Sequence, residues 1–168
     1  MKRSAALFFA ILLFFCMLIS CAEHESPPSC REILSSVAEA EIGLPSGKFY
    51  SMTAEKGDDE YLSESLISSL FGGGSYPTVA KDWLDCALFL SIGNHPCELA
   101  IILCQNHDAA LDTARLLNDR LSAIKITKNT SEYAKMIDSA KVTVKGNYAI
   151  LLISSDSENA MKIFMKSK

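Results

Sequence analysis

The amino-acid sequence predicts an α+β fold, with a small, mainly antiparallel sheet packed against about four helices. Two apolar runs of strand length, "ELAIILC" and "YAILLIS", each follow a shorter strand and a turn that contains Gly-Asn. A segment with helical character comes after each run, so the unit strand, turn, strand, helix occurs twice. Helical stripes and capping signals before the first unit predict further helices.

The first helix is expected to begin at Ser29, because Ser29 and Glu32 have the spacing of a capping box. Gly43 followed by Pro45 is a typical helix end. Between these signals, apolar residues recur on one helical face, which consists of Ile33, Val37, Ala40 and Leu44.

A short strand over residues 48–53 and a second helix over residues 58–71 are expected next. That helix would turn Leu62, Leu66, Ile67 and Leu70 inward and stop at three glycines. The glycines do not form a P-loop, since no Gly-Lys-Ser/Thr follows them. The acids Asp58, Asp59 and Glu60 favour a solvated helix N-terminus, where negative charge is stabilising, over a catalytic pair.

The two strand units share the same spacing from an aspartate to Gly-Asn, from Asp85 in the first and from Asp138 in the second. Either the unit is duplicated or two hairpins obey the same turn rules. Gly146 and Asn147 fit a two-residue type II′ turn with glycine first, whereas the turn at Gly93 belongs to a longer loop.

Strand composition predicts the order within the sheet. Val142 and Val144 alternate with lysine and threonine, which is typical of a half-exposed strand near an edge. The unbroken apolar runs at residues 99–103 and 149–153 favour interior strands covered on both faces.

Two helices are expected to cover this sheet. The first runs from His107 to about Ile124 and carries an apolar stripe of Ala110, Ala114, Leu117, Leu121 and Ile124. The last opens with a capping box from Ser155 to Glu158 and buries Ala160, Ile163 and Phe164.

Residues 1–20 are expected to be a lipoprotein signal peptide. Lys2 and Arg3 precede an uncharged apolar run that has the length of a signal h-region and is short for a membrane span. The sequence Leu-Ile-Ser-Cys that ends at Cys21 resembles a bacterial lipobox, in which the cysteine thiol carries a diacylglyceryl group and the chain is cut before it. A plain secretory signal and an uncleaved anchor are the alternatives.

Residues 21–28 form a polar, proline-containing tether whose reach is at most about 25 Å. Two acyl chains hold a protein stably, so we expect the cell membrane, on its extracytoplasmic face, as the location. Residues 29–168 are expected to form a single α+β domain, since 148 of the 168 residues stay after cleavage. A two-lobed transporter-binding protein usually needs about twice this length.

The formal charge of −4 becomes −6 once Lys2 and Arg3 are removed. This balance argues against nucleic acid as a partner, and it favours cationic over anionic partners. The expected partners are the membrane, through the lipid at Cys21, and an envelope protein or small ligand.

The stretches "CELAIILCQNHDAALDTARLLNDRL" and "AKVTVKGNYAILLISSDSENAMKIF" resemble a family of short lipoproteins from Gram-positive anaerobes, catalogued as domain of unknown function 4358. In that family an extended E-(I/L)-A-V-F strand precedes a helix, and a V-x-V-x-G-N-Y hairpin precedes the last helix. The resemblance covers residues 84–164. It implies the anchor and the fold but no activity, cofactor or functional residue.

Four residues have the chemistry of a zinc site, namely His95, Cys97, Cys104 and His107. The expected strand between the two pairs would separate them by about 20 Å, so no metal site is expected. Structural positions explain the four residues instead. His95 is expected in a loop, Cys97 half-buried, Cys104 in the core and His107 in the first turn of a helix. If oxidised, Cys30, Cys86, Cys97 and Cys104 allow three pairings, and they can equally be thiols.

The sequence contains no Gly-x-Ser-x-Gly elbow, and no Ser-x-x-Lys set in a suitable context. No catalytic residue is therefore assigned. A non-enzymatic binding or interaction module is the preferred hypothesis, and a small envelope hydrolase with an unrecognised active site is the alternative.

Overall fold

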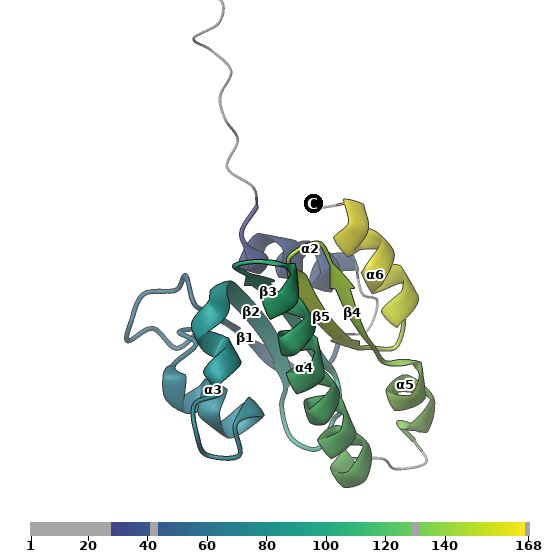
Figure 1. The fold of residues 1–168 in the computed structure, drawn as a ribbon. Helices are drawn as coiled ribbons and strands as arrows, with labels where there is room; N and C mark the ends of the chain where they lie inside the picture. The colour runs from purple at the N-terminus through teal and green to yellow at the C-terminus, as the bar shows by residue number, and fades with distance from the viewer. Residues whose placement is uncertain (1–27, 41–43, 129–131, 167–168) are drawn as a thin grey trace, which may run out of the picture.

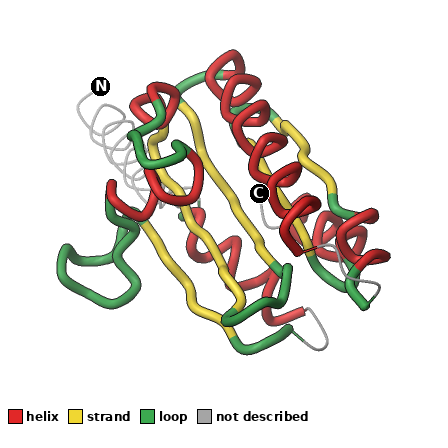
Figure 2. The backbone as a smooth tube through the Cα atoms, turned by 90° about the horizontal axis from the view of Figure 1, so that it is seen from below, coloured by secondary structure: helices red, strands yellow, loops and turns green. Residues whose placement is uncertain are grey.

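The computed structural model describes residues 28–40, 44–128 and 132–166 of the chain. Within them, five strands form one antiparallel sheet in the order β1-β2-β3-β5-β4. Figure 2 shows the strands side by side, flanked by helices. The predicted α+β class and the mainly antiparallel sheet are confirmed.

The elements follow each other along the chain as in Figure 1. Their bounds are α2 (Cys30–Ala40), β1 (Gly47–Ser51), α3 (Glu64–Phe71), the 3-10 turn η1 (Thr78–Asp82), β2 (Trp83–Ser91), β3 (Glu98–Cys104), α4 (His107–Lys128), α5 (Ala134–Ser139), β4 (Lys141–Lys145), β5 (Tyr148–Ile153) and α6 (Ser157–Lys166).

The sheet separates two apolar cores. Figure 1 shows α4 crossing in front of the sheet and α2 lying behind it. On the α4 side the core includes Leu88, Ile102 and Leu117, and on the α2 and α6 side it includes Phe89 and Phe164. Because β3 and β5 are covered on both faces, their side chains are apolar throughout most of their length.

The expected strand positions are confirmed. The strand with alternating valines, β4, lies at an edge of the sheet, and the two apolar runs form the neighbouring interior strands β3 and β5. The turn between β4 and β5 has Gly146 at φ +57°, and its neighbour Asn147 has a negative φ, as a type II′ turn requires.

The capping box of the first helix is also confirmed. The backbone N–H of Ser29 donates to Glu32 Oε2 at 2.7 Å, and the N–H of Glu32 donates to Ser29 Oγ at 3.2 Å. The predicted apolar face is rotated slightly, because Leu34 is buried and Ala40 is exposed. Gly43, the predicted helix end, lies outside the described residues.

The second helix is shorter than predicted. Residues 58–60 lie in turns, and α3 begins only after Ser63, whose Oγ accepts the N–H of Leu66. Tyr61 instead forms a bridge with Ser51 at the end of β1, and the N–H of Leu62 donates to Ser51 O. This extended pairing holds the chain out of the helix, so the acidic run does not lie at the helix N-terminus.

The last helix also begins later than predicted. Asp156, not Ser155, caps α6, because its Oδ1 accepts the N–H of Asn159 at 3.0 Å. Ala160 and Phe164 are buried as expected, whereas Ile163 is half-buried. The helix that starts at His107 continues past Ile124 to Lys128.

Candidate binding groove

A groove runs between α6 and the edge strand β4. Lys141 and Thr143 of β4 pair with Leu152 and Ile150 of β5, whose side chains belong to the core under α2 and α6. Alternate strand residues share a face, so Lys141 and Thr143 point to the α6 side of the sheet. The helix therefore covers β5 and leaves this face of β4 open.

The start of α6 is fixed to the sheet by Ser157. Its Oγ lies 3.3 Å from both Leu152 O and Ser154 O, at the end of β5. From this point the helix extends over ten residues, which is a length of about 15 Å. Helix α6 therefore forms one wall of the groove, and the hydrogen bonds of Ser157 fix where this wall begins.

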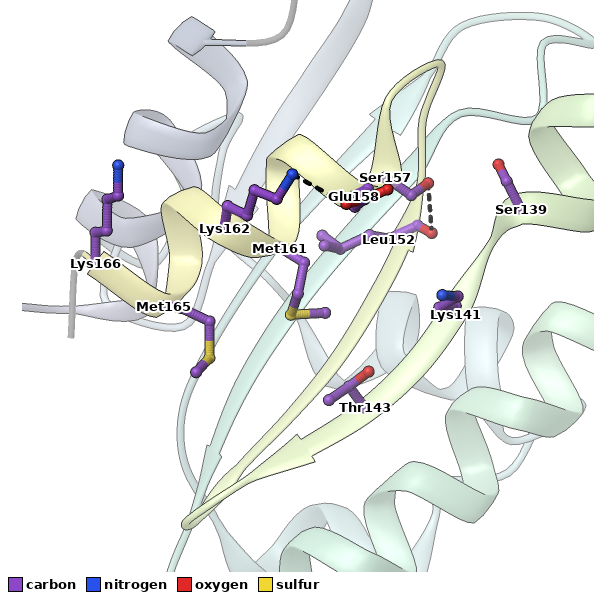
Figure 3. Close-up of a pocket in the computed structure, with 10 residues that line it drawn as sticks. All are labelled: Ser139, Lys141, Thr143, Leu152, Ser157, Glu158, Met161, Lys162, Met165 and Lys166. Carbon is purple, nitrogen blue, oxygen red and sulfur yellow. Dashed lines mark hydrogen bonds and ion pairs between the residues drawn. The ribbon is translucent and has the colours of Figure 1, made fainter.

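The cavity between these elements has a volume of about 610 Å³. Figure 3 shows the side chains of Met161 and Met165 extending from α6 into the space that faces Thr143 of β4. Met161 is half-buried, and Met165 is 44% exposed despite its apolar side chain. The apolar part of the lining consists of Leu152, Met161 and Met165.

The charged part of the lining is mainly basic: it contains Lys141, Lys162 and Lys166 against the single acid Glu158. Lys162 Nζ lies 2.9 Å from Glu158 Oε1. This hydrogen bond lowers the pKa of Glu158 and raises that of Lys162, and the charge of Lys141 also lowers the pKa of Glu158. Lys141 and Lys166 form no ion pair with a described residue.

A second, smaller cavity of about 300 Å³ lies between α2 and β1. The Arg31 guanidinium lies 4.1 Å above the Phe49 ring and pairs with Glu60 at 3.0 Å. Its cation is thus already engaged, and the α6–β4 groove is the better candidate for a ligand.

The four cysteine and histidine residues considered as a zinc site are not brought together. Strand β3 lies between Cys97 and Cys104, as expected, and the two thiols belong to opposite cores. His95 Nδ1 accepts the N–H of Cys97 at 3.1 Å, and His107 Nδ1 lies 2.8 Å from Gly146 O. Within the described ranges, no three metal-binding side chains form a group.

The four described cysteines lie in the interior, and none of them forms a disulfide with another. Cys97 is 2% exposed, so the prediction that it is half-buried is wrong. Burial, the largest cause in each case, raises the pKa of Cys30, Cys86 and Cys104 above their ordinary value of 9.0. Such thiols are poor nucleophiles at neutral pH, because the thiolate is the reactive form.

Asp85 is a buried acid whose role sequence reasoning missed. Its Oδ2 accepts the N–H of Cys30 at the start of α2, at 2.7 Å. Its Oδ1 is buried and has no hydrogen-bond partner within the described residues. The available signal was the acid itself, in a strand whose other residues are apolar up to Leu90.

The groove was missed for a related reason. Its basic residues come from β4 and α6, and the sequence does not show that these segments lie side by side. The one local signal is the repeat of Met-Lys at Met161 and Met165, which places both methionines on one helical face. Cys21, the predicted lipid site, lies outside the described residues.

None of the described helices has the length and apolar character needed to cross a bilayer. Comparisons of the chain with models of protein families, with curated proteins and with solved structures find no match.

Proposed function

We propose that the protein is an extracytoplasmic lipoprotein, anchored to the cell membrane through Cys21, that acts as a non-enzymatic binding module. The observation that carries the binding role is the groove between α6 and β4, with its cavity of about 610 Å³. Small-ligand pockets typically have volumes of about 300–1,000 Å³. Methionine side chains adapt to irregular ligand shapes, which suits such a wall.

The anchor is supported by the N-terminal sequence, where a basic start and an apolar run lead to a lipobox-like motif at Cys21. A short tether would then hold the groove close to the membrane surface.

The lining of the groove favours binding over hydrolysis. Its hydroxyl groups belong to Ser139, Thr143 and Ser157, and Ser157 Oγ is engaged by backbone carbonyls. Among the described residues, neither His95 nor His107 lines this cavity. A hydrolase site would need a nucleophile next to a base, as in a serine–histidine pair.

The experiment is to release the full-length protein from its envelope in detergent-free lipid discs and to identify retained small molecules by mass spectrometry. Thr143→Trp should fill the groove, and Thr127→Trp on the exposed surface of α4 is the matched control. A molecule retained by the parent and by Thr127→Trp, but lost from Thr143→Trp, is expected. An unchanged set of molecules in a folded Thr143→Trp variant would contradict the proposal.

A further inference from the structure

The charge of the groove is opposite to that of the whole chain. The protein carries a formal net charge of −4, yet three lysines and one glutamate line this cavity. A further acid, Asp156, acts on both Glu158 and Lys162 from outside the lining, and its Oδ1 accepts the N–H of Asn159. A positive rim on an acidic protein attracts anionic groups locally.

Two of the three lysines act on the same carboxylate, that of Glu158. Lys162 bonds Glu158 directly, and Lys141 acts on the same carboxylate across the groove from β4. Ammonium groups from two separate elements thus act on one exposed carboxylate, Lys162 through a direct contact and Lys141 through its charge. A carboxylate or phosphate of a ligand would be held by the same two groups, in competition with Glu158.

The apolar part of the groove continues from this position along α6. Met161 and Met165 are one helical turn apart and point to the same side, whereas Figure 3 shows Lys166 pointing away from them. A ligand that follows this surface must therefore be elongated and apolar beyond its charged end.

We propose, as an extension of the proposed binding function, that the groove takes a single-chain anionic amphiphile. The acyl chain lies along Met161 and Met165, and the anionic head group lies between Lys141 and Lys162. A polar anion would leave the methionines exposed, and a neutral apolar molecule would leave Lys141 without an ion-pair partner. A single-chain anionic amphiphile contacts both the apolar and the basic part of the lining.

The probe is a photoreactive dodecanoate with a diazirine near the end of its chain. Full-length protein in zwitterionic lipid discs is labelled over a range of probe concentrations, and the modified peptides are mapped by mass spectrometry. We expect adducts on the segment that contains Met161 and Met165. A dodecyltrimethylammonium probe with the same diazirine should label this segment much less.

Two variants with opposite expected effects test the head-group position. Lys141→Gln should raise the probe concentration for half-maximal labelling by about two- to fivefold, the range for exposed charge interactions. Glu158→Gln should lower it by a similar factor, because it removes the competing carboxylate from Lys162. Lys125→Gln, on the exposed surface of α4, should change nothing.

Equal labelling by the anionic and cationic probes, or no effect of Lys141→Gln and Glu158→Gln, would overturn the anionic ligand class. The groove could then still retain a molecule that Thr143→Trp removes, so the binding function is tested separately. Protection of Met161 and Met165 by phosphatidylglycerol vesicles, with no labelling by the monomeric anionic probe, would overturn the proposal in favour of membrane contact.

Discussion

The backbone N–H of Cys30 donates to Asp85 Oδ2 at 2.7 Å, although the two residues are 55 positions apart in the chain. Cys30 is the first residue of α2, so the carboxylate lies at the positive end of a helix. This contact joins the first residue of α2 to the start of β2. It thereby fixes the position of the first turn of α2 against the sheet.

Replacement of Asp85 by alanine should lower the free energy of unfolding by about 1–3 kcal/mol. The substitution leaves the buried N–H of Cys30 without its acceptor, which is the costly case for a hydrogen bond. Urea unfolding of the full-length protein measures the effect. Asp119→Ala, at an exposed position on α4, should stay within about 0.5 kcal/mol of the parent. Equal losses in both variants would show that the contact with Cys30 contributes nothing specific.

Replacement of Gly146 by valine should cost about 1–3 kcal/mol, because a β-branched residue is strained at a positive φ. The φ of Gly146 is +57°, whereas its neighbour Asn147 has a negative φ. Asn147→Ala is therefore the matched control and should be nearly neutral. Thermal unfolding compares the two variants, and lipid attachment at Cys21 should be the same in both. A Gly146→Val protein as stable as the parent would be incompatible with this turn.

The stability of the domain should fall as the pH rises above 9. Burial raises the folded-state pKa of Cys30, Cys86 and Cys104 above the ordinary value of 9.0. Below pH 9 the thiols are protonated in both states, and above it they ionise more readily when unfolded. The folded state is then disfavoured by up to about 1.4 kcal/mol per pH unit for each thiol.

Urea unfolding between pH 8 and pH 10 measures this dependence. The raised pKa values of Tyr76, Tyr133 and Tyr148 start from 10.0, so they add to the effect only at higher pH. Cys86→Ala should reduce the slope of stability against pH. A slope that is flat in the parent would mean that the thiols are accessible to water.

Replacement of Cys21 by alanine should leave the precursor uncleaved and free of lipid. The proposed lipobox requires this thiol for attachment, and cleavage follows attachment. Labelling of cells with a fatty-acid analogue and the mass of the mature chain measure both steps. Cys16→Ala, in the apolar run before the motif, is the matched control and should be processed normally. Lipid on the Cys21→Ala protein would show that the anchor lies elsewhere.

The parts of the fold that depend on local patterns could be predicted from the sequence. The alternation in β4, the apolar run of β5 and the Ser29–Glu32 capping box each involve residues close in sequence. The start of α3 could not be predicted in this way. It depends on the pairing of Tyr61 with Ser51, which extends the chain where helical spacing alone indicated a helix.

The candidate site depends even more on contacts between distant segments. Lys141 and Glu158 interact across the groove only because β4 pairs with β5 and α6 returns over that strand. The negative net charge of the chain favoured cationic partners. A sum over all residues cannot show that lysines are in excess along one groove. Only the arrangement of β4 beside α6 indicates an anionic ligand.

The central claim, that this groove binds a single-chain anionic amphiphile, is tested most directly by NMR of methionine methyl groups. Full-length protein with labelled methionine methyls, in zwitterionic lipid discs, is titrated with dodecanoate and then with dodecyltrimethylammonium. Met161 and Met165 line the groove, whereas Met52 packs against the core on the α4 side and serves as the internal reference. The account predicts saturable shifts of the Met161 and Met165 signals with dodecanoate alone, and an unchanged Met52 signal. Equal shifts with both amphiphiles, or no shift of the groove methionines with dodecanoate, would contradict it.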